Sequence, residues 1–228
     1  MNHMGISLEN MSQAAWYNRW TLQKISKFLK GDILEIGCGT GNFTQSLTNF
    51  GKIWAIDIDQ EFIKQTRKRV SNDVQINIGD IENGRYFFKN KKFDSIICFN
   101  VLEHIEDDIK ALNNLYQLLK YDGKLILLVP AHPALFGSID KAVGHFRRYQ
   151  KNQLLKTLEK HNFKIICSKN LNFLGALGWW FAGKVLRNKS VDEKKLSFFN
   201  KIAPYILPIE DIINIPLGTS ILVIARKS

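Results

Sequence analysis

Short apolar runs alternate with longer segments of helical periodicity over the first 130 residues, and this alternation restricts the fold more than any other feature. The apolar runs cover residues 32–36, 52–57, 74–78, 93–99 and 123–129, and the segments 42–49, 60–71 and 107–119 have helical spacing. In the last segment one apolar stripe is formed by Ile109, Leu112, Leu115, Leu118 and Leu119. Repeated strand, helix and strand units predict a parallel sheet with helices on both faces.

The pattern changes beyond Pro130, where an irregular basic stretch spans residues 131–149. A helix is predicted over 152–161, a strand over 163–170 and a final strand over 220–225. The chain contains no internal repeat, low-complexity tract or glycine–serine linker, so a second independent domain is not expected. The sequence therefore predicts one α/β domain.

A glycine-rich segment, Leu34-Glu35-Ile36-Gly37-Cys38-Gly39-Thr40-Gly41-Asn42, joins the first apolar strand to the helix that follows it. Glycines there let the backbone turn sharply and approach a ligand, while amides of the following helix point toward that ligand. The spacing is G-x-G-x-G and position 42 is Asn, whereas dinucleotide-binding enzymes have G-x-G-x-x-G. A pyrophosphate is therefore not the expected ligand.

Three carboxylates lie at or near the ends of the first three predicted strands. Glu35, two residues before the first glycine, would repel a pyrophosphate but suits the ammonium group of an amino-acid moiety. Asp57 lies 57 − 37 = 20 residues beyond the first glycine, where a carboxylate can accept both ribose hydroxyl hydrogens. Asp80 follows the third strand, in reach of an adenine amino group. The alternative for Asp57 and Asp80 is that they cap helices.

Together with Asn100-Val101-Leu102-Glu103-His104 after the fourth strand, this ordered set resembles the motifs of class I S-adenosylmethionine (SAM)-dependent methyltransferases over residues 30–130. The resemblance implies a Rossmann-like, seven-stranded, mostly parallel sheet with the last strand antiparallel. It also implies that one domain spans 1–228, with an N-terminal helical lid (1–30), a cofactor-binding core (30–130) and substrate-side insertions (131–216). The cofactor-binding residues that it indicates are Glu35, Gly37, Gly39, Gly41, Asp57, Ile58, Asp80, Ile81 and Asn100.

Methyl transfer from a sulfonium is an in-line displacement, so it depends mainly on positioning and requires no metal. A hydroxyl nucleophile, such as an alcohol or phenol, must also lose a proton, and the candidate catalytic residues near the expected carboxyl edge of the sheet are His145 and His104. His145 lies in a long loop rich in basic and aromatic residues, a setting that often carries function. For His104, capping or packing is an equal alternative.

Candidate substrate-binding residues come from both ends of the core: Trp16, Tyr17, His132, Arg147, Arg148 and Tyr149. Arg147 and Arg148 either clamp a phosphate or carboxylate of the substrate or pair with neighbouring acids. Trp16 and Tyr17 either fold over the cofactor or belong to a helix that packs on the core. An apolar segment over 173–183 with a basic continuation is predicted to line a pocket, to touch a membrane surface, or to pack under the sheet edge.

The 32 Lys and Arg residues outnumber the 21 Asp and Glu residues, which gives a formal net charge of +11. This excess suits anionic partners, although a codon bias toward Lys gives the same charge with no partner. Cys38, Cys98 and Cys167 show neither disulfide nor zinc spacing and are predicted to be reduced and buried in the core. With no signal-like N-terminus and no apolar run of about 18 residues, a cytoplasmic protein is predicted.

These features predict an enzyme that transfers a methyl group from SAM to a small-molecule or lipid-like acceptor, most readily at oxygen, and releases S-adenosylhomocysteine. Two alternatives stay open. The charge suits an RNA methyltransferase, although no attached RNA-binding module is found. The second alternative is a non-catalytic SAM-binding protein that keeps the pocket as a scaffold.

Overall fold

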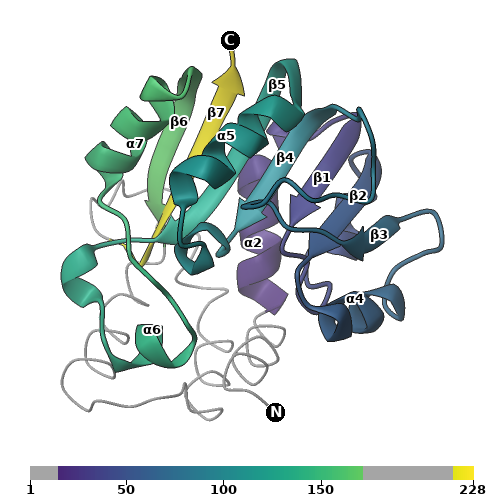
Figure 1. Cartoon of the computed structure of the whole chain (residues 1–228), viewed down its shortest axis with the longest axis horizontal. Coiled ribbons are helices and arrows are strands. Elements are labelled where there is room, and N and C mark those ends of the chain that lie inside the picture. The colour runs from purple at the N-terminus through teal and green to yellow at the C-terminus, as the bar shows by residue number, and fades with distance from the viewer. Residues whose placement is uncertain (1–14, 172–217) are drawn as a thin grey trace.

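The computed structural model describes residues 15–171 and 218–228, which form a single central sheet flanked by helices (Figure 1). The apolar segment predicted over 173–183 and its basic continuation lie outside these residues. Within the described part, no helix combines the length and the apolarity that crossing a membrane requires. Of the three cysteines, Cys38 and Cys98 are buried in the core, as predicted, whereas Cys167 is partly accessible.

Seven strands form the sheet in the spatial order β3-β2-β1-β4-β5-β7-β6. The strand β7 runs antiparallel to both β5 and β6, and the other neighbouring pairs are parallel. This arrangement confirms the predicted Rossmann-like sheet with its last strand antiparallel. The strands are β1 (Asp32–Ile36), β2 (Lys52–Asp57), β3 (Gln75–Ile78), β4 (Phe93–Phe99), β5 (Leu119–Pro130), β6 (Phe163–Leu171) and β7 (Ser220–Lys227).

Side chains of the central strands are buried on both faces of the sheet, which explains why these strands are continuous apolar runs in the sequence. Successive residues point to opposite faces, so Ile33 joins one core cluster and Leu34 joins the other. The same alternation separates Ile126 from Leu127 on β5. The sheet thus divides the interior into two hydrophobic cores.

Helices cover both faces of the sheet. Figure 1 shows α2 (Ala15–Ile25) behind the sheet and α5 (Asp108–Leu118) and α7 (Lys151–Lys160) in front of it. The core that contains α2 also includes residues of α3 (Thr44–Leu47) and α4 (Gln60–Arg67). The remaining elements are the short helices η1 (Ser26–Phe28), η2 (Leu102–His104), η3 (Pro133–Leu135) and α6 (Ser138–Ala142).

Several predicted boundaries were wrong by a few residues. The helix predicted over 42–49 is reduced to α3, because the glycine-rich turn continues to Phe43, and α4 ends four residues earlier than predicted. The strand β5 starts earlier than predicted, at Leu119, which pairs with Phe93 across an irregularity in the register. The helix α6 was not predicted, since five residues are too few to show an apolar period.

The chain order reverses between β1 and β4, the two neighbouring central strands. From β1 the chain proceeds outward through β2 to β3 and then returns to place β4 on the other side of β1. In open α/β sheets, ligands bind beyond the carboxyl ends of the strands at such a switch point. The loops after β1, β4 and β5 therefore define the candidate site.

Candidate active site

The loop after β1 turns through three glycines in the left-handed region, with φ angles of 70° at Gly37, 51° at Gly39 and 83° at Gly41. A β-carbon on Gly37 would lie 2.3 Å from Cγ2 of Val101, on the loop after β4. Both the backbone angle and this close approach require glycine at position 37. The turn lies at the switch point, where Gly37 is partly accessible and Gly39 and Gly41 are buried.

Asp57, at the end of β2, connects the glycine-rich loop to the turn that precedes α4. Its Oδ2 accepts a hydrogen bond of 2.8 Å from the Gly39 amide, and its Oδ1 accepts one of 2.9 Å from the Asp59 amide. Burial raises the pKa of the Asp57 carboxyl, and these amide hydrogen bonds oppose the rise. Asp57 does not cap α4, because the N-cap is Asp59, whose side chain accepts from the Glu61 amide.

Glu35 lies on β1 directly before the loop, and its carboxyl group is buried beside the Thr44 hydroxyl. Burial raises the pKa of Glu35 to about 8, Thr44 lowers it and the Asp57 charge raises it further. Its Oε2 has no hydrogen-bond partner within the residues that the structure describes. A cationic group bound next to Glu35 would therefore stabilise the carboxylate form.

The other predicted cofactor-binding residues lie beyond β2, β3 and β4. Ile58 is 75% exposed, so its side chain is free to cover a ligand, whereas Ile81 is buried. Burial alone would raise the pKa of Asp80, but hydrogen bonds from the Asn83 amide and side chain lower it. Asn100 adopts a φ of 51°, and its backbone amide donates a hydrogen bond of 2.7 Å to the Leu128 carbonyl.

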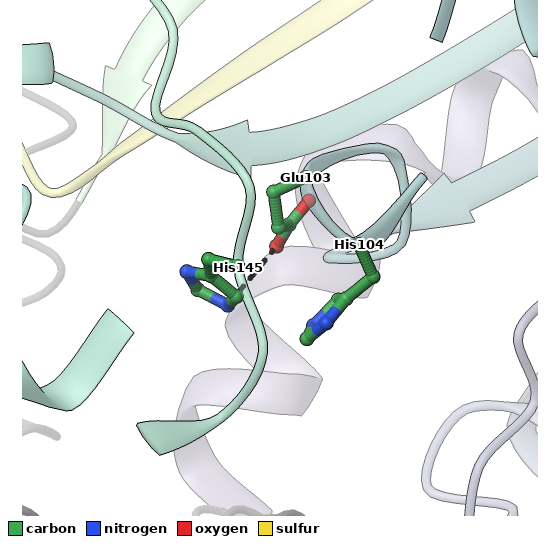
Figure 2. Close-up of side chains that lie close together, drawn as sticks. All are labelled: Glu103, His104 and His145. Carbon is green, nitrogen blue, oxygen red and sulfur yellow. Dashed lines mark ion pairs between the residues drawn. The ribbon is translucent and has the colours of Figure 1, made fainter. Parts of the chain in front are cut away.

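On the other side of the switch point, η2 and the segment after α6 bring together Glu103, His104 and His145 (Figure 2). The Phe146 amide donates to the Glu103 carbonyl at 2.8 Å, which fixes the two segments against each other. His145 Nε2 lies 3.9 Å from Glu103 Oε1, and the His104 and His145 rings are 4.6 Å apart at 82°. The two predicted catalytic histidines are therefore neighbours.

Glu103 is buried in this cluster, and His104 and His145 are partly buried. Neither carboxylate oxygen of Glu103 has a hydrogen-bond partner among the described residues, and burial raises its pKa to about 8. His104 Nδ1 is likewise buried without a partner in the described part of the chain. Burial and the neighbouring His145 lower the pKa of His104 to about 4, so this ring is neutral at physiological pH.

Asp140 on α6 orients His145, and sequence reasoning missed it. Its Oδ1 lies 2.9 Å from His145 Nδ1 and accepts a hydrogen bond of 2.8 Å from Arg148 Nε, while Oδ2 accepts from the Gly137 amide at 2.9 Å. Burial opposes ionisation, but His145 and Arg148 lower the pKa of Asp140 overall. No spacing in the sequence distinguishes this Asp from a surface residue.

Three of the predicted substrate-binding residues make internal contacts that brace the loop. The Arg148 side chain is 2% exposed and, besides Asp140, donates to the Ala131 carbonyl at 3.2 Å. Arg147 forms an ion pair with Asp108 at 2.9 Å. The Tyr149 hydroxyl contacts the Leu102 carbonyl at 3.1 Å and Asp108 Oδ2 at 2.9 Å. Pairing with neighbouring acids, one of the two alternatives, is thus what the structure shows for both arginines.

The other predicted substrate-binding residues lie in two different environments. Tyr17 is buried in the core against Trp20, with ring centroids 5.9 Å apart, whereas Trp16 is 40% exposed. The packing of α2 on the sheet favours the core alternative for Tyr17. His132 follows β5 with a φ of 58°, and its Nε2 is buried without a hydrogen-bond partner among the described residues.

The chain is similar in sequence to known proteins. A profile of the methyltransferase domain covers residues 34–127. An uncharacterized protein of Methanocaldococcus jannaschii is 30% identical over 176 residues, which span 74% of this chain and 73% of that protein. The chain belongs to the class I SAM-dependent methyltransferases. The predicted family, its enzymatic class and its cofactor are thereby confirmed.

Two further methyltransferases show how varied the similar proteins are. The malonyl-acyl-carrier-protein O-methyltransferase 1 of Ilyobacter polytropus is 27% identical over 148 residues, 60% of this chain but only 54% of that enzyme. The structure of the N-methyltransferase NodS of Bradyrhizobium japonicum with S-adenosyl-L-homocysteine has a TM-score of 0.60 at 18% identity, covering 92% of this chain and 84% of NodS. The latter likeness concerns the fold.

Proposed function

We propose that this methyltransferase transfers the methyl group of SAM to an oxygen nucleophile of a small molecule by in-line displacement. The observation that supports this proposal best is the Asp57 carboxylate, which holds the Gly39 amide and the Asp59 amide at the switch point. A carboxylate oxygen has lone pairs for more than one donor, so Asp57 keeps acceptor capacity for ribose hydroxyls. Glu35 lies deeper along β1, where a buried carboxylate suits the ammonium of the methionine moiety.

The remaining cofactor contacts are proposed from the arrangement of the loops. Exposed Ile58 and buried Ile81 would flank the adenine ring, and Asp80 would accept from the adenine amino group. The backbone around Gly37 to Gly41 and Asn100 would surround the methionine part. These assignments follow the family resemblance of the residues.

The named relatives support a small-molecule acceptor. The side chains at the site support oxygen as the methylated atom. The Ilyobacter relative is an O-methyltransferase and NodS is an N-methyltransferase, so the relatives leave the atom open. His104 and His145 lie at the carboxyl ends of β4 and β5, where they are proposed to contact the acceptor oxygen. His132 and Trp16 are proposed to line the acceptor pocket, and Arg147 to attract an anionic group.

Calorimetry with SAM tests the cofactor pocket. Asp57→Asn keeps the shape of the side chain but weakens its acceptance of ribose hydroxyl hydrogens, so SAM affinity should fall by about 1–3 kcal/mol. Asp59→Asn is the matched control two residues away, because Asn also caps helices well and Asp59 faces α4. Equal affinity of wild type and Asp57→Asn would contradict the ribose assignment.

Turnover tests the reaction itself. The full chain, incubated with SAM and a panel of hydroxylated, aminated and carboxylated small molecules, should release S-adenosylhomocysteine with an oxygen acceptor. SAM binding without turnover across the panel would favour the non-catalytic alternative. Methylation of RNA with a steep salt dependence of binding would instead revive the nucleic-acid alternative.

A further inference from the structure

We propose that Glu103, His104 and His145 form a binding site for a divalent transition-metal ion. One carboxylate oxygen and one ring nitrogen from each histidine lie within 4.8 Å of one another. Figure 2 shows Glu103 and His104 projecting from η2 and His145 approaching from the facing segment. Metal–ligand bonds to nitrogen and oxygen are about 2.0–2.2 Å long, so modest side-chain rotations bring three ligands around one ion.

The electrostatic state of Glu103 supports a cation at this point. The residue is fully buried, and both of its carboxylate oxygens are without a hydrogen-bond partner among the described residues. Buried polar groups in proteins are normally paired, and a buried carboxylate is normally paired or coordinates a metal. His104 Nδ1, also buried and without a partner in the described region, adds a second unused donor of an electron pair.

The orientation of His145 supports the same ligand. Asp140 is an acceptor at the 2.9 Å contact, so His145 Nδ1 donates the hydrogen and Nε2 carries the lone pair. That lone pair lies on the side of the ring where Glu103 Oε1 is 3.9 Å away. Histidines that bind metals commonly donate their other ring nitrogen to a carboxylate in this way.

Asp140 is itself held in place, which fixes the histidine that it orients. Arg148 Nε and the Gly137 amide each donate to it, at 2.8 and 2.9 Å. This support accounts for the burial of Arg148 at a loop that otherwise faces the carboxyl edge of the sheet. Asp140 is therefore a positioning residue for the proposed ligand His145.

The donor set selects the kind of ion. Two imidazoles and one carboxylate suit Zn²⁺, Mn²⁺, Fe²⁺ or Co²⁺, whereas Ca²⁺ and Mg²⁺ prefer sets made of oxygen. Three protein ligands leave at least one coordination position open. If the proposed methyl transfer to oxygen is correct, an acceptor hydroxyl bound at that position would become more acidic and lose its proton more readily.

Cobalt titration of the metal-free full chain, without a histidine tag, tests the site. Visible absorption should report one Co²⁺ per chain, and Zn²⁺ should displace it. Glu103→Gln should weaken Zn²⁺ binding by at least about 10-fold, and Asp140→Asn by about 10- to 100-fold. His161→Gln is the matched control, because His161 bonds to the Thr157 carbonyl in its own helix and should leave affinity unchanged.

The outcomes separate this proposal from the proposed function. X-ray absorption of the Co²⁺-loaded wild type, which needs no variant to fold, should show two histidine ligands. Less than half an equivalent of bound metal, or equal loss in His161→Gln and Glu103→Gln, would overturn the site. Calorimetry with SAM on the same samples reports the cofactor pocket independently, so failure of either proposal is visible without the other.

Discussion

Gly37 and Val101 pack so closely that a β-carbon at position 37 would meet Cγ2 of Val101 at 2.3 Å. The contact joins the loop after β1 to the loop after β4 at the switch point of the sheet. Because position 37 has no side chain, the loop after β1 packs directly against the segment that carries Glu103 and His104.

Gly37→Ala should destabilise the fold by at least about 2 kcal/mol, because it adds left-handed backbone strain and an overpacked contact. Urea unfolding measures the loss. Val101→Ala in the same chain should recover the part due to the contact but not the backbone strain, which a double-mutant cycle separates. Additive effects of the two substitutions would mean that the loops do not touch.

Glu35 should make the stability of the ligand-free protein depend on pH. Its pKa is about 8 in the folded state against an ordinary 4.5, so the folded state holds a proton that the unfolded state has lost. The stabilising contribution of the neutral carboxyl is complete below pH 4.5 and is lost as the pH rises to about 8. Glu35→Gln should therefore be more stable than wild type at pH 8, measured by urea unfolding, with no such gain near pH 5.

SAM binding should also release a proton from Glu35 at pH 7, because an ammonium next to the carboxyl favours its charged form. Calorimetric titrations in buffers of different ionisation enthalpy measure the number of protons released. The release should be smaller in Glu35→Gln and unchanged in Glu61→Gln, whose carboxyl is exposed on α4. Identical release in all three proteins would contradict contact between Glu35 and the ammonium.

The adjacent arginines should behave differently. Arg148→Met removes a buried partner of Asp140 and should cost about 3 kcal/mol or more of unfolding free energy. Arg147→Met breaks an ion pair with Asp108 that is partly exposed, so about 1 kcal/mol or less is expected. Thermal and urea unfolding measure both. A large rise in KM for Arg148→Met with unchanged stability would instead indicate a direct role in binding the acceptor.

Tyr149→Phe should cost about 1–2 kcal/mol, because the buried Leu102 carbonyl and Asp108 lose a shared hydroxyl. Tyr116→Phe is a suitable comparison, since its hydroxyl donates to the Ser228 carbonyl at an exposed position. Urea unfolding of the two variants should show the larger loss for Tyr149→Phe. Equal losses would indicate that the loop after β5 is not braced through Tyr149.

The positions of the strands along the chain, and the clustering of the glycine-rich turn with carboxylates at strand ends, were predictable from local sequence. Central strands buried on both faces produce apolar runs that stand out without any knowledge of their neighbours. The glycine spacing around Gly37 and the carboxylates at positions 35 and 57 follow strand ends, and the parallel topology brings strand ends together. Their proximity therefore follows from chain order.

The acceptor side was less predictable, because its contacts depend on how an irregular loop folds. Asp140 reaches His145 through a five-residue helix that leaves no periodic signal. Arg148 is buried, whereas adjacent Arg147 is partly exposed, and no local pattern distinguishes them. The burial of Glu103 does have a local signal, because its carboxylate lies among the apolar residues Val101, Leu102 and Ile105.

The antiparallel strand β7 pairs with β5 on one side and β6 on the other. During synthesis β6 leaves the ribosome well before residues 220–227, so until these residues have emerged β6 has no strand partner and β5 is paired only with β4. The edges of β5 and β6 that later pair with β7 stay unpaired through that interval, and unpaired strand edges promote association with other nascent chains. The affinity of the growing chain for a chaperone should accordingly persist until β7 is released.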